Sequence, residues 1–291
     1  LPPMMKNHGN YIVSLSNVCK WLGEVAEGLG VEIYPGFSAA EVLFDDNKKV
    51  KGVATGDMGV SRDGSAKDSW ESGMELHAKY TLFSEGTRGS LSKFLIENFN
   101  LSENSDFQKY AIGLKELWEI NEENFDDGLV EHSMGWPLSD ETKGGSFLYH
   151  FDKNLVSIGY VIHLNYTNPY VSPFDEFQQF KTHPSVKKVL KGGKRISYGA
   201  RAITTGGYQS VPKLYFPGGA IIGCSAGFLN YPKIKGTHNA MESGMLAAEA
   251  IIDNYISNNQ ENDLTNYQEK YENSRSAKEL KRVRNIKPYQ A

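Results

Sequence analysis

The sequence contains only two cysteines among its 291 residues, Cys19 and Cys224. Two thiols so far apart can build neither a disulfide framework nor a four-thiolate metal site from this chain alone. A large excess of one charge sign is also lacking, because 31 basic and 35 acidic side chains give a formal net charge of -4. The one basic cluster, at residues 278–287, is local. The sequence therefore lacks the electrostatic footprint of a nucleic-acid-binding protein, and we expect no nucleic-acid partner.

Long hydrophobic runs are absent as well. No apolar stretch approaches the roughly 18 residues that a membrane-spanning helix needs. The first residues, LPPMMKNHGNY, lack the charged and then apolar layout of a signal peptide. The chain begins on a Pro-Pro pair and stops on NIKPYQA, which we interpret as a segment of something longer. What is present, 40% hydrophobic and 12% aromatic residues, is ordinary for a globular chain with a sizeable core.

The first third of the chain predicts one helix followed by strands. Residues 14–30 carry apolar side chains at helical spacing, with a serine at 14 or 16 available as the N-cap and a glycine as the stop. Short β-rich runs follow, separated by a turn at 45–47 and a polar, glycine-bearing segment at 57–73. This pattern predicts a hairpin, a loop and a returning strand.

The middle and the tail predict different structures. Strand-like runs fill residues 110–164, and a short helical segment lies between Pro173 and Pro184, which predicts an antiparallel sheet with a helix against it. Residues 256–275 are rich in Asn, Gln and Glu, a composition that suits a linker and a solvated helix equally well.

Glycines stand at two predicted strand-to-helix corners. In YTLFSEGTRGSLSKFL, residues 80–95, a strand ends in Ser84, Glu85 and Gly86, and Gly89 precedes a helix. Glycine lets the backbone approach a ligand closely, and the start of a helix offers unpaired N–H groups. A plain tight turn would explain this first corner equally well.

The second corner lies within residues 216–251 and is richer in small residues. A strand and turn carry Gly218, Gly219, Gly223, Ala226 and Gly227, and a further glycine at 236 opens a helix with one apolar face. The positive end of that helix points at whatever fills the turn. The alternative is a glycine-rich corner with nothing bound.

The two corners together resemble fingerprints of FAD-dependent oxidoreductases of the hydroxybenzoate-hydroxylase-like superfamily. FSEGTRGSLSK is similar to its strand, acidic-Gly, Ser and basic pattern, and IGCSAGFLN followed by GTHNAMESGMLAAEAI is similar to its Gly-Asp turn. Cys224 departs, because most of that superfamily has Asp there. Read with GGSFLYH, GGKRISYGARA and GGYQSVPKL, these segments are very similar to the electron transfer flavoprotein-ubiquinone oxidoreductase family, from NHGNYIV to VRNIKP.

The resemblance implies an α+β or α/β architecture of the hydroxybenzoate-hydroxylase-like FAD-dependent oxidoreductase fold. Residues 1–95 would form part of an FAD-binding domain, and residues 96–199 an inserted antiparallel-sheet domain that binds ubiquinone. Residues 200–255 would continue the FAD-binding domain, and residues 256–291 would be a C-terminal helical segment in contact with a membrane surface.

The resemblance also implies FAD as the cofactor. The residues matched to its binding site are Glu85, Gly86, Gly223, Cys224, Ser225, Ala226, Gly227, Gly236, Thr237, His238 and Asn239. No catalytic acid or base is expected, because electron transfer needs a tuned potential rather than a proton abstractor. A direct proton role for His238 is the alternative to a flavin-proximal or helix-capping one.

Gly144 and Gly145 match the pair that contacts the quinone ring in this family. Adjacent glycines in a strand usually mark a bulge, a turn or a ligand against bare backbone, and a simple hairpin turn remains the alternative here. Lys143, just before them, stands where a Tyr is more usual.

The resemblance implies that the complete protein accepts electrons from reduced electron transfer flavoprotein and passes them to ubiquinone. It would thus link fatty-acid and amino-acid oxidation to the respiratory chain. Its place would be membrane-peripheral, at the mitochondrial inner membrane on the matrix side or the bacterial inner membrane on the cytoplasmic side. The segment at 264–286 would touch lipid through its few apolar residues, with weak attachment assisted by Lys278, Lys281, Arg282 and Arg284, unless it is simply a solvated charged helix.

Two family features are missing from the sequence. The dinucleotide-binding Gly-x-Gly-x-x-Gly would lie upstream of LPPMMKNHGNY, and the four cysteines of the 4Fe-4S cluster would follow VRNIKP, so the cluster belongs to the complete protein only. Two alternatives stay open. AMESGMLAAEAI suits a geranylgeranyl-reductase-like FAD-dependent prenyl reductase, and the missing motifs favour a non-catalytic fragment.

Overall fold

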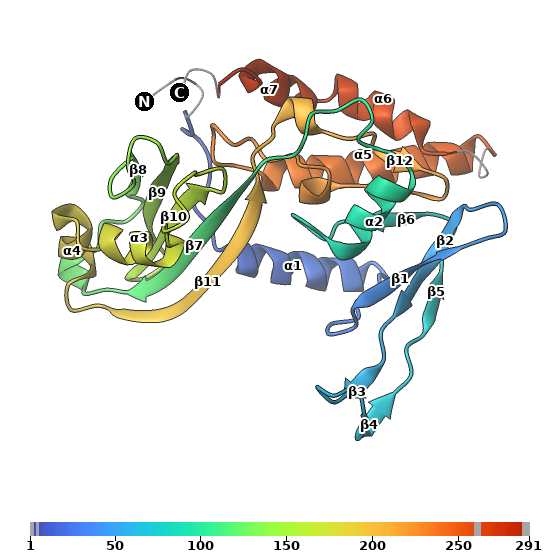
Figure 1. Cartoon of the computed structure of the whole chain (residues 1–291), viewed down its shortest axis with the longest axis horizontal. Helices are drawn as coiled ribbons and strands as arrows, with labels where there is room; N and C mark the ends of the chain where they lie inside the picture. Colours follow the sequence, from blue (N-terminus) through green and yellow to red (C-terminus); the bar gives the residue numbers. More distant parts are fainter. Residues whose placement is uncertain (1–2, 4–5, 259–262, 287–291) are drawn as a thin grey trace. The chain divides into compact units, whose positions relative to one another are not determined.

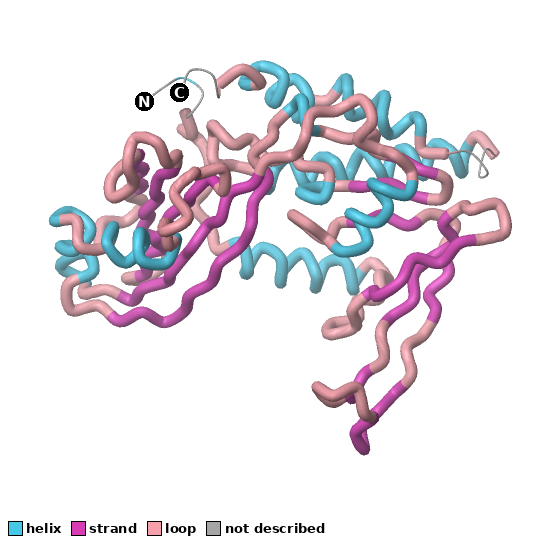
Figure 2. The backbone as a smooth tube through the Cα atoms, in the orientation of Figure 1, coloured by secondary structure: helices cyan, strands magenta, loops and turns pink. Residues whose placement is uncertain are grey.

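The computed structural model describes residue 3, residues 6–258 and residues 263–286 (Figures 1 and 2). The chain forms two compact units. Unit 1 comprises Leu1–Lys6, Glu32–Gln108 and Thr204–Ala291, and unit 2 comprises Asn7–Val31 and Lys109–Ile203. Because the larger part of unit 2 lies between two parts of unit 1 in sequence, the chain leaves unit 1 and later returns to it.

Unit 1 contains two three-stranded sheets. The first, in the order β1-β2-β5, is antiparallel and is formed by β1 (Ala39–Phe44), β2 (Val50–Thr55) and β5 (Glu75–His77). The second, in the order β12-β13-β6, is formed by β12 (Tyr215–Phe216), β13 (Gly219–Ile221) and β6 (Thr81–Phe83). In the second sheet β13 runs parallel to β6, which brings segments far apart in sequence side by side.

A two-stranded ribbon occupies the segment that the sequence predicted to be a loop. β3 (Met58–Val60) pairs antiparallel with β4 (Ala66–Glu71). The turn between them is stabilised by Asp63, whose carboxylate accepts a 3.0 Å hydrogen bond from the amide of Ser65, and by Gly64 at φ +88°. The loop prediction is therefore wrong, because this local turn chemistry closes a hairpin despite the polar composition.

The described part of unit 1 also contains four α-helices, namely α2 (Ser90–Asn98), α5 (Thr237–Ile256), α6 (Thr265–Asn273) and α7 (Arg275–Val283). Their buried faces share one core with the sheets. The stacked rings of Phe99 and Phe216 lie 5.2 Å apart, and Leu95 and Ala247 are fully buried. Small residues such as Ala247 let α5 pack closely on this core.

The described part of the tail forms α6 and α7 rather than a linker, and several of its apolar side chains are buried. Leu264, Tyr267, Tyr271 and Leu280 are at most 2% exposed. The Tyr271 ring stacks on that of Phe228 at 4.4 Å. The expectation that these residues face lipid or solvent is therefore wrong, because tyrosine rings supply the buried face of α6. Residues 259–262 and 287–291 of the predicted membrane segment and tail lie outside the described residues.

Unit 2 is built on a five-stranded antiparallel sheet in the order β11-β7-β10-β9-β8. Its strands are β7 (Tyr110–Glu119), β8 (Val130–Met134), β9 (Gly144–Phe151), β10 (Leu155–His163) and β11 (Lys194–Thr204), with helices α3 (Pro173–Phe180) and α4 (Pro184–Leu190). Alternate residues of the central strand β10, among them Ile158 and Tyr160, are fully buried with Phe177 and Phe180 of α3. The predicted antiparallel sheet with a helix against it is confirmed.

Helix α1 (Leu15–Gly28) begins where the sequence predicted, with the hydroxyl of Ser14 accepting a 3.4 Å hydrogen bond from the amide of Asn17. No residue of α1 is buried, and its apolar side chains Leu15, Trp21 and Val25 are 42–60% exposed. The amphipathic pattern thus correctly predicted the helix, although several side chains of its apolar face are exposed.

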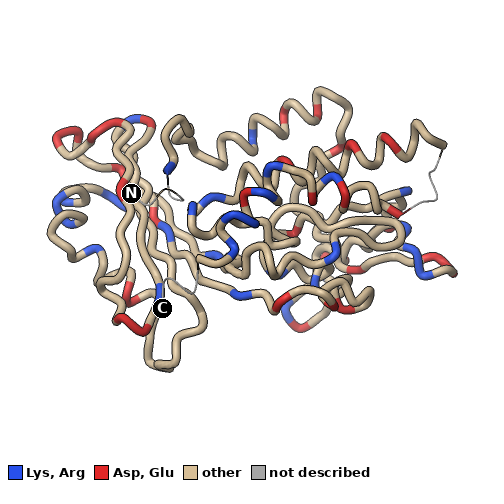
Figure 3. Tube along the Cα trace, turned by 90° about the horizontal axis from the view of Figure 1, so that it is seen from above, with Lys and Arg blue, Asp and Glu red and all other residues tan. Residues whose placement is uncertain are grey.

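Charges of both signs are interspersed along the chain (Figure 3). None of the helices formed by described residues is long and apolar enough to cross a bilayer.

Candidate functional site

The two glycine corners lie together at the carboxyl ends of β6 and β13, in the second sheet of unit 1. Ile221 of β13 pairs with Phe83 of β6, so the two parallel strands end side by side. Each strand leads directly into a corner, and the hydroxyl of Ser225 donates a 3.2 Å hydrogen bond to the carbonyl oxygen of Gly86. Ligands of parallel α/β sheets bind beyond the carboxyl ends of strands, which is where this junction lies.

The second corner is a turn of 3-10 helix, Gly223–Ser225, that rests on α5. Gly223 has φ +62°, and its amide donates a 2.9 Å hydrogen bond to the buried hydroxyl of Ser243. A Cβ at position 223 would lie 3.5 Å from the Cβ of Ala240. Because that distance is an ordinary van der Waals contact, it is the positive φ that explains why glycine stands here.

Helix α5 presents its N-terminus at the same corner. The amide of Ala240 donates a 2.9 Å hydrogen bond to the carbonyl of Gly236, the first such bond of the helix. In a helix the amides before that point, here those of Thr237, His238 and Asn239, have no intrahelical acceptor. They carry the positive end of the helix dipole, which suits an anionic group.

Glu85 uses its carboxylate within the protein. Its oxygens accept hydrogen bonds from the amides of Leu91 and Ser92 at 3.2 and 2.5 Å, and from the Ser92 hydroxyl at 2.6 Å. Glu85 therefore caps the first turn of α2. The neighbouring Gly86 has φ +79°, and a Cβ at this position would point into open space. Gly86 therefore leaves its backbone accessible to a ligand.

The side chain of Asn239 is also occupied. It is fully buried, donates a 2.8 Å hydrogen bond to the carbonyl of Phe228, and accepts one of 2.8 Å from the hydroxyl of Ser276. Any contact between Asn239 and a ligand is thus left to its backbone amide.

His238 has a partner that the sequence did not reveal. Its Nε2 lies 3.0 Å from Oε1 of Glu279 on α7, 41 positions later. Burial raises the pKa of Glu279, but the hydrogen bonds from Asn230 and His238 and the nearby charges outweigh it, so the pKa of this carboxyl lies below its usual range. Glu279 gave no sequence signal, because it stands in a charged run like any solvated helix.

Cys224 is half-buried within the turn, and burial raises the pKa of its thiol. The thiol is therefore neutral at physiological pH, and the position brings no negative charge to the corner. Among the described residues no group of three or more His, Cys, Asp or Glu side chains lies together as a metal site.

Gly144 and Gly145 begin β9 in unit 2, and neighbouring strands approach both of them closely. A Cβ on Gly144 would lie 2.5 Å from the carbonyl oxygen of Val161, and one on Gly145 would lie 2.5 Å from that of Ser133. Strand packing alone therefore requires glycine at both positions. Because β9 alternates, Gly145 shares a face with Phe147 and Tyr149, whose stacked rings lie 5.5 Å apart.

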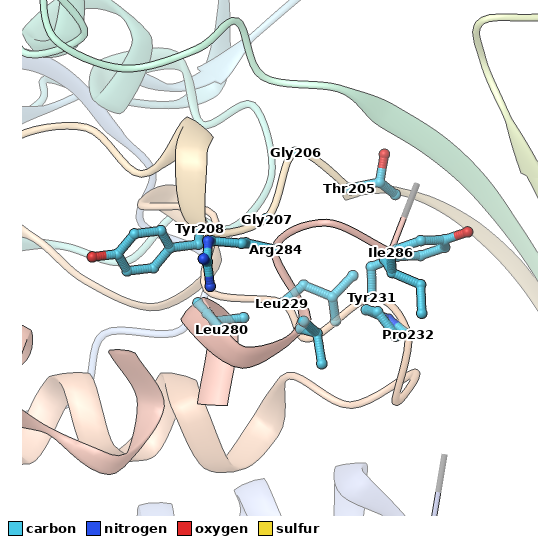
Figure 4. Close-up of a pocket in the computed structure, with 11 residues that line it drawn as sticks. Thr205, Gly206, Gly207, Tyr208, Leu229, Tyr231, Pro232, Leu280, Arg284 and Ile286 are labelled. Atoms are coloured by element: carbon cyan, nitrogen blue, oxygen red, sulfur yellow. The ribbon is translucent and has the colours of Figure 1, made fainter. Parts of the chain in front are cut away.

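A small pocket lies elsewhere in unit 1. It is formed by the segment after β11, the loop after Phe228 and the end of α7 (Figure 4), with Thr205, Gly206, Tyr208, Leu229, Leu280 and Ile286 among its lining residues. The sequence did not predict this pocket, and none of the residues matched to FAD lines it.

Part of unit 2 matches a known family of domains. Residues 110–203 match the family described as "ETF-QO, ubiquinone-binding". The chain is 55% identical over 291 residues to the human mitochondrial electron transfer flavoprotein-ubiquinone oxidoreductase, covering 98% of this chain and 47% of the relative. It is 54% identical over 288 residues to the Pseudomonas aeruginosa protein of that name, covering 98% of this chain and 52% of the relative. The chain thus resembles these oxidoreductases along almost its whole length and spans about half of theirs.

Solved structures share the fold. A geranylgeranyl bacteriochlorophyll reductase-like protein of Thermoplasma acidophilum matches with a TM-score of 0.72 at 18% identity, over 98% of this chain and 66% of that one. A flavin-dependent brominase matches with a TM-score of 0.64 at 16% identity, over 96% of this chain and 64% of that one. These likenesses show a mixed α/β fold found in flavin-dependent enzymes.

Proposed function

We propose that this chain is the middle portion of an electron transfer flavoprotein-ubiquinone oxidoreductase, an enzyme that accepts electrons from reduced electron transfer flavoprotein and reduces ubiquinone through FAD. The observation that carries the proposal is the 55% identity over 98% of the chain, together with the ubiquinone-binding match at residues 110–203. The activity belongs to the complete protein, of which a 4Fe-4S cluster would also be part.

The flavin half of FAD would occupy the corner where β6 and β13 end. The fit rests on three features of this chain, namely the bare backbone at Gly86, the turn at Gly223–Ser225, and the first-turn amides of α5. When bound, FAD would accept two electrons and release them singly. The amides of Thr237, His238 and Asn239 would stabilise negative charge on it by typically ~0.3–1 kcal/mol, more where buried. This arrangement supports the finer assignment to the hydroxybenzoate-hydroxylase-like superfamily.

The remaining matched residues would shape that corner. Cys224 brings no charge to it. Ala226 is buried in the core, and Gly227 and Gly236 leave room for the neighbouring side chains of Gln108 and Leu229. No residue is proposed as a catalytic acid or base.

Ubiquinone would bind in unit 2, against the face of β9 that carries Gly145. A flat quinone ring offers two oxygens and an otherwise apolar surface, which suits aromatic neighbours and exposed main-chain groups. The rings of Phe147 and Tyr149 share that face. Gly144 would contribute its main chain only, because its missing side chain would point to the opposite face, toward Leu138.

We further propose a membrane-peripheral location, at the mitochondrial inner membrane or the bacterial inner membrane, because the substrate is lipid-soluble. The buried tyrosines of α6 remove the apolar contact expected from the sequence. Any contact by this segment would depend on cations of α7 such as Lys278 and Lys281, which are solvent-accessible.

A prenyl reductase is the weaker candidate. The reductase-like structure shares the fold at only 18% identity, whereas the oxidoreductases are three times more similar in sequence. The corner around Gly223 suits any flavoprotein of this fold and does not discriminate between the two reactions.

The test measures two half-reactions on the full-length protein. We expect reduced electron transfer flavoprotein to reduce its flavin, and the reduced enzyme to pass electrons to a short-chain ubiquinone. Saturation of a geranylgeranyl chain without quinone reduction would favour the prenyl reductase, and absence of bound flavin would support a non-catalytic protein.

A further inference from the structure

A carboxylate on α7 reaches the N-terminus of α5. Glu279, whose side chain is 17% exposed, accepts hydrogen bonds from Nδ2 of Asn230 at 2.5 Å and Nε2 of His238 at 3.0 Å. Nζ of Lys233 lies 3.8 Å from its other oxygen. One side chain thus joins α7 to the first turn of α5 and to the loop between Phe228 and Gly236.

That loop is closed by its own hydrogen bonds. Asn230 and Lys235 exchange backbone hydrogen bonds of 2.9 and 3.2 Å, and the side-chain oxygen of Asn230 accepts one of 3.1 Å from the amide of Lys233. Because the side-chain amide nitrogen of Asn230 donates to Glu279, the carboxylate is connected to this hydrogen-bonded loop. The loop contributes two cations, Lys233 and Lys235, to the surroundings of the helix N-terminus.

A second carboxylate fixes α7 independently. Glu242 of α5 accepts a 2.8 Å hydrogen bond from the amide of Ser276 and another from the Ser276 hydroxyl, at the start of α7. The Ser274 hydroxyl accepts a 3.1 Å hydrogen bond from the amide of Ala277. Since these contacts already anchor the start of α7, Glu279 is not needed to hold that helix in place.

We propose that Glu279 is a positioning residue for His238, holding the imidazole toward α7 and setting the net charge that the N-terminus of α5 presents to the flavin. This inference rests on the proposed function. The site gathers hydrogen-bond donors and cations, namely the first-turn amides of α5, the imidazole and two lysines. Glu279 supplies a carboxylate that contacts both His238 and Asn230 of the loop.

The expected effect follows from charge. Glu279→Gln keeps the shape of the side chain and its hydrogen-bond acceptor oxygen, but it removes a negative charge next to His238. The ratio of the affinity for a reduced, anionic flavin to the affinity for the oxidised form should then increase. The increase would be about two- to fivefold if the effect equals that of a charge at a helix terminus. The midpoint potential of the flavin should rise accordingly.

Two measurements on the full-length protein test the proposal, with Glu242→Gln as the matched control. In the absence of added cofactor, Glu279→Gln should accelerate amide hydrogen exchange at residues 230–238, whereas Glu242→Gln should do so at the start of α7. With FAD bound, only Glu279→Gln should raise the midpoint potential, and Glu279→Asp should restore part of the wild-type value.

Different outcomes would contradict the role proposed for Glu279 and the proposed FAD-dependent function. Unchanged exchange at 230–238 in Glu279→Gln overturns the role of Glu279, whether or not flavin binds. An unchanged or lower midpoint potential of the flavin in Glu279→Gln would also overturn the role of Glu279. An equal rise of that potential in Glu242→Gln would do the same. Failure of the wild-type protein to bind any flavin would instead overturn the proposed function.

Discussion

The hydroxyl of Ser225 donates a 3.2 Å hydrogen bond to the carbonyl oxygen of Gly86, which lies 139 positions earlier in the chain. This contact joins the turns that follow two parallel strands, so the two glycine motifs lie next to each other. It also gives Ser225 a role that does not require contact with a ligand, since it fixes the distance between the two turns.

Replacing Ser225 by Ala should weaken the binding of FAD. The loss of one hydrogen bond costs about 1 kcal/mol, which corresponds to about fivefold in the dissociation constant if the two turns separate. Titration of the full-length apoprotein with FAD, followed by flavin fluorescence, measures this. Ser105→Ala is the control, because it removes a similar 3.3 Å contact to a backbone carbonyl at an exposed position. Equal affinities of the Ser225 variant and the wild type would contradict the role given to this contact.

The 291-residue chain alone should retain little FAD. The corner proposed for FAD would hold only the flavin half, and no Gly-x-Gly-x-x-Gly occurs in these residues to hold the pyrophosphate and adenosine. Gel filtration of the isolated chain with added FAD should therefore separate the two. A yellow protein with one FAD per chain after that step would show that these residues suffice.

Gly145→Val should block ubiquinone reduction by distorting the edge of the sheet in unit 2. The added Cβ would lie 2.5 Å from the carbonyl oxygen of Ser133, so β8 has to move. Such overpacking typically costs ~1–3 kcal/mol. In the full-length protein we expect a lower melting temperature and loss of quinone turnover, with flavin content and reduction by electron transfer flavoprotein retained.

Gly199→Val is the matched control for that variant. Gly199 lies on the edge strand β11 of the same sheet, and no atom lies within 4 Å of the position its Cβ would occupy. Its substitution should leave quinone turnover unchanged. Normal quinone turnover in Gly145→Val would remove this face of β9 from the quinone site, and loss of flavin would show that the damage reaches beyond unit 2.

The stability of unit 2 should depend on pH through His150. The ring is fully buried, and Nδ1 accepts a 3.1 Å hydrogen bond from the amide of Asp126, so the folded protein requires the neutral imidazole. Burial lowers the pKa of His150, despite the opposing charges of Asp126 and Glu131. Protonation therefore favours the unfolded state. The contribution of His150 is complete above the unfolded pKa of about 6.5 and is lost as the pH falls below it.

His150→Asn removes the titrating ring but can keep an acceptor for the amide of Asp126. Chemical denaturation of this variant between neutral and mildly acidic pH should show a shallower decline in stability than the wild type. His77→Asn, at an exposed position, controls for the loss of any histidine. If the His150 variant and the wild type decline in parallel, His150 does not determine this pH dependence.

The sequence predicted those features that depend on local patterns. Helix α1 was found from its apolar spacing and its Ser14 cap, and the glycine corners from the small residues that positive φ angles require at Gly86 and Gly223. The antiparallel sheet of unit 2 followed from its alternating strands. These signals are local because each results from the conformational preference of a few neighbouring residues.

Features that depend on long-range contacts could not be predicted in this way. The polar composition of residues 256–275 concealed a buried face made of Tyr267 and Tyr271, whose rings pack on segments more than 40 positions away. Glu85 was matched to the cofactor, yet its carboxylate caps α2. The contact between Glu279 and His238 could not be predicted from the sequence, because only the fold brings α7 to His238. A sequence pattern shows which residues have special chemistry, whereas their partners depend on tertiary packing.

FAD binding at the corner is tested most directly by amide hydrogen exchange of the full-length protein in the presence of excess FAD. We expect slower exchange at residues 223–227 and 236–239, at the junction of β6, β13 and the N-terminus of α5, with little change in unit 2. Bound FAD that leaves these amides unprotected, or that protects the pocket at Thr205–Tyr208 instead, would contradict binding at this corner.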